Sequence, residues 1–237
     1  MTGDINQIRE TFIEGRVFLF DKPLKWTSFD VVNKIKSILR HRLEIKKIKI
    51  GHAGTLDPLA SGLLIICTGK ATRQIELYQD LPKTYTGTFV IGQITPSYDL
   101  ETLPEGQYPT SHITAELINK TANSFIGKQL QLPPIYSAKK IEGKRAYTLA
   151  RKGKHAELKP KEISISAFDI TRIELPEVDF RVTCSKGTYI RGLARDFGEK
   201  MESGAYLGAL RRTDIGQFSV SQAIQMHGFE ELFSPNY

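Results

Sequence analysis

The sequence predicts a mixed α/β (α+β) protein in which helices and loops flank a central mixed or antiparallel sheet. Several segments show the two-residue alternation of half-buried strands, and helical patterns lie between some of them. The order of these segments is irregular, unlike the repeating βαβ series of a doubly wound sheet. With 237 residues and no internal repeat, the chain is long enough to bury a substantial core. We therefore expect one catalytic domain that spans residues 1–237.

The N-terminal part begins with a strand and a helix. Residues 16–20 have the pattern of a short strand, and Pro23 is expected to end the extended segment that follows. Thr27-Ser28-Phe29-Asp30 has the form of a capping box, which is a start signal for a helix. Apolar residues then recur at helical spacing, at Val32, Ile35, Leu39 and Leu43.

Further along, alternating or continuous apolar residues predict more strands, over residues 62–68, 84–91, 163–173 and 178–184. Helices are predicted over residues 113–125 and 144–152. Residues 96–110 hold three prolines and several acidic residues, which is the composition of an exposed loop.

A fourth helix is predicted to begin near Thr188. Its buried stripe consists of Ile190, Leu193, Ala194, Phe197 and Met201. This pattern leaves Arg191 and Arg195 together off the stripe, one helical turn apart.

The charge of the chain favours a polyanionic partner. Lys and Arg number 33 against 26 Asp and Glu, which gives a net charge of +7. Seven of these basic residues lie between Lys34 and Lys49, with only Glu44 to oppose them. Such a density suits a phosphate backbone, although a solvated helix face explains it equally well.

The two cysteines and the termini indicate a cytoplasmic protein. Cys67 and Cys184 form no Cys-x-x-Cys pair, and Cys67 lies in an apolar run, so reduced and buried thiols are expected. The N-terminus has no basic segment followed by an apolar stretch, and no apolar run reaches the ~20 residues that cross a bilayer.

The segment with the clearest chemistry is Gly51–Gly62, which holds three glycines, His52 and Asp57 between two apolar strands. Pro58 biases Asp57 toward an extended backbone, so the carboxylate is expected to be aimed rather than mobile. An alternative is that Asp57 only caps a turn. A phosphate-binding loop ending at Gly69-Lys70 is excluded, because six residues separate its glycines and Ala71 follows the lysine.

The segment Gly51–Gly62 closely resembles the catalytic-aspartate motif of the TruB family, G-H-x-G-T-L-D-P-x-A-x-G. Four further blocks in the family's order extend the resemblance from residue 16 to about residue 220: Asp21-Lys22-Pro23 with Trp26-Thr27-Ser28, Lys83-Thr84-Tyr85, Pro133–Lys140 with Gly143–Tyr147, and Cys184–Gly198 with Gly204-Ala205 and Leu210-Arg211-Arg212. One departure is Lys25, which stands where the family usually has glycine.

The resemblance implies a pseudouridine synthase fold and an isomerase that converts uridine 55 in the TΨC arm of tRNA to pseudouridine. It implies no cofactor and no metal ion, and we expect a monomer with no obligate protein partner and no membrane association. Many family members carry a C-terminal domain of PUA type. Only about seventeen residues follow Val220, so the chain looks like a short form without that domain.

Site residues also follow from the resemblance. Asp57 is the implied catalytic carboxylate, and Arg191 matches the arginine that holds it charged. Tyr85 is implied to stack on the target uracil and to assist at its C5, and Tyr189, Leu210 and His52 complete the implied substrate pocket. The lysines expected to contact the RNA backbone are Lys22, Lys46, Lys47 and Lys49.

Two other functions use the same features. A noncatalytic RNA-binding or tRNA-folding protein would need the basic surface but not Asp57. A nucleoside or glycoside hydrolase would also use a carboxylate, but it would release a free base.

Overall fold

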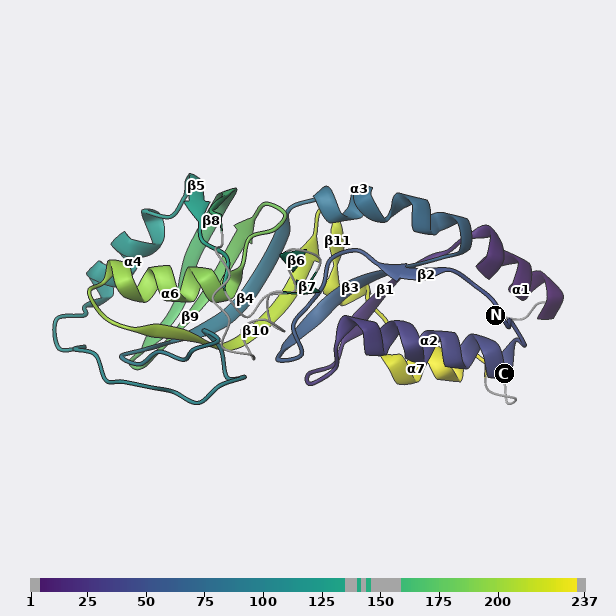
Figure 1. The fold of residues 1–237 in the computed structure, drawn as a ribbon, viewed down its shortest axis with the longest axis horizontal. Helices are drawn as coiled ribbons and strands as arrows, with labels where there is room; N and C mark the ends of the chain where they lie inside the picture. The colour runs from purple at the N-terminus through teal and green to yellow at the C-terminus, as the bar shows by residue number, and fades with distance from the viewer. Residues whose placement is uncertain (1–4, 135–139, 142–143, 146–158, 234–237) are drawn as a thin grey trace. The chain divides into compact units, whose positions relative to one another are not determined.

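The computed structural model describes residues 5–134, 140–141, 144–145 and 159–233, and these form two compact units (Figure 1). Unit 1 contains the described residues of 1–85 and 211–237, and unit 2 those of 86–210. Strands β4 (Lys83–Ile91) and β10 (Ala205–Ile215) contribute residues to both units. The predicted mixed α/β class is confirmed. Whether the chain is one functional domain stays a prediction.

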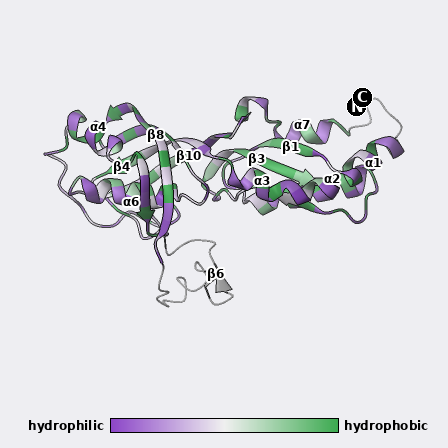
Figure 2. Ribbon diagram, turned by 90° about the horizontal axis from the view of Figure 1, so that it is seen from above, coloured by the Kyte–Doolittle hydropathy of each residue, from purple (hydrophilic) through white to green (hydrophobic). Residues whose placement is uncertain are grey.

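Unit 1 is built on β3, a strand that is apolar almost throughout (Figure 2). β3 pairs antiparallel with β1 and β2, and the register sets Lys22 opposite Gly62 and His52 opposite Ile66. The elements of unit 1 besides β4 and β10 are α1 (Ile5–Glu14), β1 (Val17–Lys22), α2 (Ser28–Arg42), β2 (Ile50–His52), β3 (Ala60–Thr68), η1 (Gly69–Gln74), α3 (Ile75–Asp80), β11 (Phe218–Ser219), η2 (Val220–Gln222) and α7 (Met226–Glu231).

Helix α2 begins as its sequence predicts. The Thr27 side chain accepts a hydrogen bond from the Asp30 N–H, and the Asp30 carboxylate accepts one from the Thr27 N–H, which completes the capping box. The predicted apolar stripe faces the core of unit 1. That core consists of Phe12, Phe20, Val31, Val32, Ile35, Ile38, Leu39, Leu43, Ile45, Leu64, Ile66 and Phe229.

Unit 2 is also built on antiparallel pairs, with β8 between β5 and β9. Five phenylalanines form its aromatic core: Phe89, Phe125, Phe168, Phe180 and Phe197. The rings of Phe89 and Phe180 stack with their centroids 4.2 Å apart. Its elements besides β4 and β10 are α4 (Ala115–Asn123), β5 (Gly127–Gln131), β6 (Lys140–Ile141), β7 (Lys144–Arg145), β8 (Lys161–Glu174), β9 (Glu177–Cys184) and α6 (Ile190–Lys200).

The predicted strands and three of the four predicted helices are confirmed within a few residues. The helix predicted over residues 144–152 is wrong at its start, because residues 144–145 pair with residues 140–141 as a short hairpin. Residues 146–152 lie outside the described residues, as does much of the block Pro133–Lys140 with Gly143–Tyr147. Both cysteines are buried free thiols, as expected.

The expectation that residues 96–110 form an exposed loop is wrong for its first part. Ser97 is fully buried and Asp99 is 5% exposed. Composition misled here, because prolines indicate only that regular structure is interrupted, whereas burial depends on what packs over the segment. Asp99 forms a bridge to Leu207 of β10, and the Leu207 N–H donates to the Tyr98 carbonyl oxygen.

Candidate active site

The loop that carries Asp57 joins β2 to β3, and residues outside the loop form hydrogen bonds with its backbone. The Leu56 N–H donates to Ser28 Oγ at 2.9 Å, and the Lys25 N–H donates to the Pro58 carbonyl oxygen at 2.7 Å. The Asp57 carbonyl oxygen accepts from the Ala60 N–H. The backbone is therefore held on both sides of the half-buried Asp57, as expected for an aimed carboxylate.

Glycine is required where β3 approaches β10. Gly62 has φ +106°, and a Cβ atom there would lie 2.2 Å from the Arg212 carbonyl oxygen. Gly54, with φ +91°, lets the loop turn beside the Arg212 side chain. The glycines of the motif therefore admit a buried arginine next to the loop.

Arg212 is that arginine, and only 1% of it is exposed. Its Nε donates to the Leu63 carbonyl oxygen at 2.7 Å, and its Nη2 donates to the Gly54 carbonyl oxygen at 3.1 Å. The guanidinium thereby joins β3 to the start of the Asp57 loop. The neighbouring Arg211 forms a bidentate pair with Asp21 at 3.0 and 2.7 Å.

The prediction that Lys22 contacts the RNA backbone is wrong, because the side chain of Lys22 is fully buried. Its Nζ donates to the carbonyl oxygens of Pro23 and Trp26. Burial lowers the pKa of Lys22 to about 8, and the Asp57 charge opposes this shift. Lys22 is thus an interior cation within electrostatic range of Asp57. The Asp-Lys-Pro pattern alone contains no signal for this burial.

His52 is half-buried, and its Nδ1 is buried without a hydrogen bond to any described residue. Burial, and then the positive charge of Arg212, lower the pKa of His52 below its ordinary value. The imidazole is therefore neutral at neutral pH. A neutral ring agrees with the view that His52 fills space beside the substrate and transfers no proton.

Tyr85 and Lys83 come from β4, and both are buried. Lys83 Nζ donates to the carbonyl oxygens of Gln79 and Leu81, which lie at the end of α3. Lys83 is therefore a third buried cation of unit 1, bound to a helix terminus. Tyr85 is 9% exposed, and its stacking on a uracil stays a prediction.

Three of the predicted catalytic and pocket residues, Arg191, Tyr189 and Leu210, lie in unit 2. Arg191, in the first turn of α6, is 5% exposed and is therefore not a surface arginine. Its Nε lies 3.6 Å from Asp99 Oδ2, and its Nη1 donates to the Ser97 carbonyl oxygen at 3.3 Å. Leu210 is half-buried on β10. The pairing of Arg191 with Asp57 stays a prediction.

Asp99 is the functional candidate that sequence reasoning missed. Its Oδ1 accepts from Ser97 Oγ at 2.6 Å and from the Glu101 N–H at 3.0 Å. Arg191 lies near its other oxygen, so both oxygens of the buried carboxylate have polar partners. The only available signal was the alternation of the polar residues Thr95, Ser97 and Asp99, which the prolines around them obscured.

Tyr189 is the N-cap residue of α6 and is half-buried. Its N–H donates to Gln131 Oε1 at 2.8 Å, and its carbonyl oxygen accepts from Gln131 Nε2 at 3.0 Å. This two-way bond fixes the start of α6 against β5, and with it the position of Arg191.

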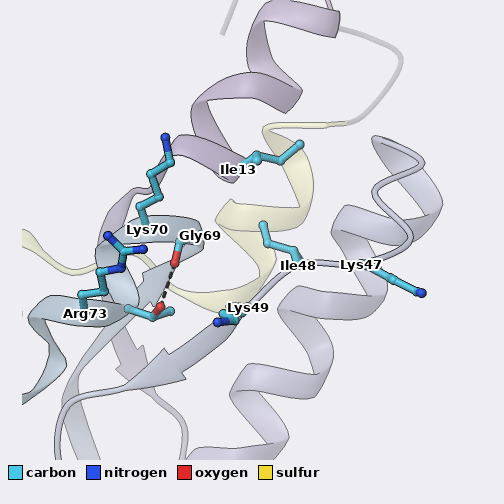
Figure 3. A pocket seen from close by; sticks show the side chains of 8 residues that line it. Ile13, Lys47, Ile48, Lys49, Gly69, Lys70 and Arg73 are labelled. Carbon is cyan, nitrogen blue, oxygen red and sulfur yellow. Dashed lines mark hydrogen bonds between the residues drawn. The ribbon is translucent and has the colours of Figure 1, made fainter.

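Lys46, Lys47 and Lys49 are exposed on the irregular segment between α2 and β2. Lys47 and Lys49 line a pocket of about 300 Å³ with Lys70 and Arg73 of η1 and with Ile13 (Figure 3). Lys70 is paired with Glu14 at 2.7 Å, whereas Lys47 extends away from Lys70 and Arg73 in Figure 3. A second pocket of about 280 Å³ is lined by Lys36, Arg40 and Lys46. The predicted basic surface is therefore present.

In the described part of the chain, no three His, Cys, Asp or Glu side chains are grouped in a way that could hold a metal ion. Among the same residues, no helix has the length and apolar character needed to span a membrane.

Comparison with known proteins gives two family matches along the chain. The family described as TruB family pseudouridylate synthase (N terminal domain) matches residues 40–190, and the tRNA pseudouridylate synthase B C-terminal domain matches residues 191–236. The tRNA pseudouridine synthase B of Flavobacterium johnsoniae is 56% identical over 94% of this chain and 97% of its own length. The protein of that name from Phocaeicola vulgatus is 53% identical, over 93% and 94%.

Solved structures with a similar fold include the Cbf5-Nop10-Gar1 complex, with a TM-score of 0.71 and 28% identity over 97% of this chain. The archaeal box H/ACA sRNP Nop10-Cbf5 complex has a TM-score of 0.69 and 25% identity over 95% of this chain. In both cases this chain spans 56% of the length of the solved chain.

We predict that Lys22 makes stability rise with pH above pH 8. Below its folded pKa of about 8, Lys22 is charged in both the folded and unfolded chains, and the folded chain bears the cost of burying it. Between pH 8 and the ordinary value of 10.5, the unfolded chain keeps a proton that the folded chain has released. Relative to Lys22→Met, wild-type protein should gain up to about 1.4 kcal/mol of unfolding free energy per pH unit in this window.

Urea unfolding of both proteins from pH 7 to 10 measures this difference. Lys70→Met is the matched control, because Lys70 is exposed, and its difference from wild type should not change with pH. A flat difference for Lys22→Met would show that the Lys22 pKa is not depressed by burial.

Proposed function

The chain belongs to the TruB family of pseudouridylate synthases, and from this premise we propose that it isomerises uridine to pseudouridine at position 55 in the TΨC arm of tRNA. Relatives named tRNA pseudouridine synthase B match this chain over nearly their whole length, which supports tRNA as the substrate. The observation that carries the site assignment is the Asp57 loop, whose backbone is fastened on both sides of the carboxylate.

The reaction breaks the bond between uracil N1 and ribose C1′ and forms a bond between C5 and C1′. The proton on C5 leaves and N1 gains one, so the product is an isomer of the substrate. Cleavage places positive character on C1′, which an ionised carboxylate can stabilise or attack. Asp57 fits either this role or removal of a ribose proton, because both need the same oxygen atoms.

The surroundings of Asp57 in unit 1 favour its charged form. The Lys22 ammonium interacts with it electrostatically, and Arg212 adds a second buried positive charge next to the loop. Oriented positive groups in a poorly solvated site stabilise an anion more strongly than they would in water. These groups stabilise the anionic Asp57 that the proposed mechanism uses.

Arg191 is the second catalytic residue that we propose, as a permanently charged partner of Asp57. Unit 2 holds this guanidinium through Asp99 and the Ser97 carbonyl oxygen. A side chain that is oriented before the substrate arrives loses little conformational entropy when it acts. The Asp99 contact thus supports a role in orienting Arg191.

The everted uracil needs a pocket, and we assign its wall to Tyr85, Tyr189, Leu210 and His52. Tyr85 is buried on its strand, Tyr189 is fixed by Gln131, and His52 is a neutral ring. Stacking on such groups offsets the unstacking of the base from the RNA arm. Lys46, Lys47 and Lys49 supply phosphate contacts.

We also propose that the chain acts as a cytoplasmic monomer, in the compartment that holds its tRNA, and needs no protein partner. The near full-length match to relatives named as one enzyme, tRNA pseudouridine synthase B, supports this. Purified protein should therefore form pseudouridine alone, and light scattering should give the mass of one chain. Activity that appears only after a second protein is added would contradict this part of the proposal.

Replacing Asp57 by Asn should reduce pseudouridine formation by at least about 10³-fold, because the change removes the ionised oxygen but keeps the size of the side chain. Release of tritium from C5-labelled uridine in a tRNA transcript measures turnover, and tRNA affinity should stay unchanged. Asp169→Asn, at an exposed position, is the control.

Full activity of Asp57→Asn would exclude the carboxylate mechanism. Chromatography of the digested product tests the alternative functions. Free uracil would indicate a hydrolase, and binding of tRNA without any product by wild-type protein would indicate a noncatalytic RNA-binding protein.

Arg191→Ala should greatly lower the single-turnover rate while changing tRNA affinity only modestly, because the guanidinium acts on a carboxylate rather than on phosphates. It also leaves Asp99 buried without its cation, which should cost about 3–5 kcal/mol of stability. Arg195→Ala, on the same helix, is the matched control. An unchanged rate for Arg191→Ala in folded protein would remove the catalytic assignment.

Replacing Lys46, Lys47 and Lys49 together by Ala should weaken tRNA binding and flatten its salt dependence by roughly one unit of slope for each lost phosphate contact. Filter binding at several salt concentrations measures both. The exposed residues Lys120, Lys128 and Lys200 of unit 2 offer a control triple with the same change in net charge. Equal slopes for wild type and the first triple would favour a solvated surface instead.

A further inference from the structure

We propose that residues 23–29, which comprise the turn after β1 and the first two residues of α2, bind a nucleotide that adjoins the target uridine. In this inference Phe29 and Leu24 contact the base, and Lys25 contacts a phosphate. It rests on the proposed function, because it takes the RNA substrate as given. We call residues 23–29 the β1–α2 turn.

Two large apolar side chains stand exposed on the β1–α2 turn. Phe29 is 61% exposed and Leu24 is 53% exposed. Single exposed apolar residues are common on protein surfaces and need no explanation. Here two of them lie on one short turn beside a candidate catalytic loop, and the same turn carries an exposed lysine.

The β1–α2 turn is bonded directly to the residues on each side of Asp57. Lys25 binds Pro58 through its backbone N–H at 2.7 Å, and Ser28 Oγ accepts from the Leu56 N–H at 2.9 Å. Ser28 Oγ also donates to the Leu56 carbonyl oxygen at 3.3 Å. A ribose that reaches Asp57 therefore brings its neighbouring nucleotide close to this turn.

Lys25 occupies a backbone conformation that favours glycine. Its φ is +68°, in the left-handed region where a side chain with a Cβ atom is strained. Strained residues concentrate at functional sites, where the surrounding structure holds them. Lys25 is exposed at a position where glycine would form the turn more easily. The charge of its side chain is complementary to a phosphate.

The combination of an exposed ring and a cation is the usual recognition mode for unpaired nucleotides, in which the base stacks on the ring and the phosphate meets the charge. Asp30 is the exposed acidic group directly after the β1–α2 turn, and its charge would oppose an RNA. Its carboxylate accepts from the Thr27 N–H at 2.8 Å and so serves the capping box. The turn therefore fits RNA better than it fits an acidic protein surface.

The test measures binding of a synthetic TΨC stem-loop RNA by fluorescence anisotropy. Phe29→Ala should raise the Kd by roughly tenfold, whereas Phe29→Tyr, which keeps the ring, should stay near wild type. Leu24→Ala should raise it less. Leu77→Ala is the control, because Leu77 of α3 is 69% exposed and lies outside the turn.

Lys25→Gly supplies an independent test, because its two expected effects have opposite signs. RNA binding should weaken and its salt slope should fall by roughly 0.7–0.9, as for one lost phosphate contact. The Tm should not fall, because glycine adopts the left-handed conformation without strain. If Lys25 had only a structural role, Lys25→Gly would not weaken RNA binding while leaving the Tm unreduced.

The outcomes separate this inference from the proposed function. If wild-type protein forms no pseudouridine, the proposed function fails. If wild type is active but Phe29→Ala and Lys25→Gly bind the stem-loop as wild type does, only this inference is overturned. The same holds if Leu77→Ala weakens binding as much as Phe29→Ala. A 2-aminopurine placed next to the target uridine should be quenched by wild type and less by Phe29→Ala.

Discussion

The candidate active site depends on how the loop between β2 and β3 is held from outside. Ser28 and the Lys25 backbone bind the residues on each side of Asp57, and Arg212 binds the Gly54 carbonyl oxygen. Most surface loops are mobile because few groups restrain their backbone. This loop is restrained by a turn far upstream and a strand far downstream, so its backbone loses little conformational entropy during the proposed reaction.

Three buried cations lie in the described part of unit 1, which also contains the Asp57 loop. Lys22, Lys83 and Arg212 are each nearly or fully buried, and each donates to backbone carbonyl oxygens. These bonds satisfy the groups in the absence of bulk water, without which burial of a charge would be very unfavourable. The result is a positive environment near Asp57. Burial, and then the charge of Arg212, lower the pKa of His52.

Unit 2 also contains a buried charged group whose polar atoms are satisfied by protein groups, but here the buried charge is negative. Asp99 is a buried carboxylate that is satisfied by Ser97 Oγ and the Glu101 N–H, and it lies beside the guanidinium of Arg191. Gln131 fixes the first turn of the helix that carries Arg191. In each unit, therefore, residues that do no chemistry in the proposed reaction hold a charged side chain in a defined position.

The sequence by itself determined the local structure and the identity of the chemical groups, because periodicity, capping residues and motif spacing act over a few residues. The strand positions, the capping box at Thr27 and the glycine-rich loop around Asp57 were all predictable in this way. Tertiary structure decided what the local pattern does not contain, namely burial and long-range partners. It buried Lys22, which had been predicted to contact the RNA backbone. It also buried Asp99, which the prolines around it had placed on the surface, and it held Lys25 in a left-handed turn. Whether a side chain is buried depends on segments distant in sequence that pack over it, so only the folded chain could settle these positions.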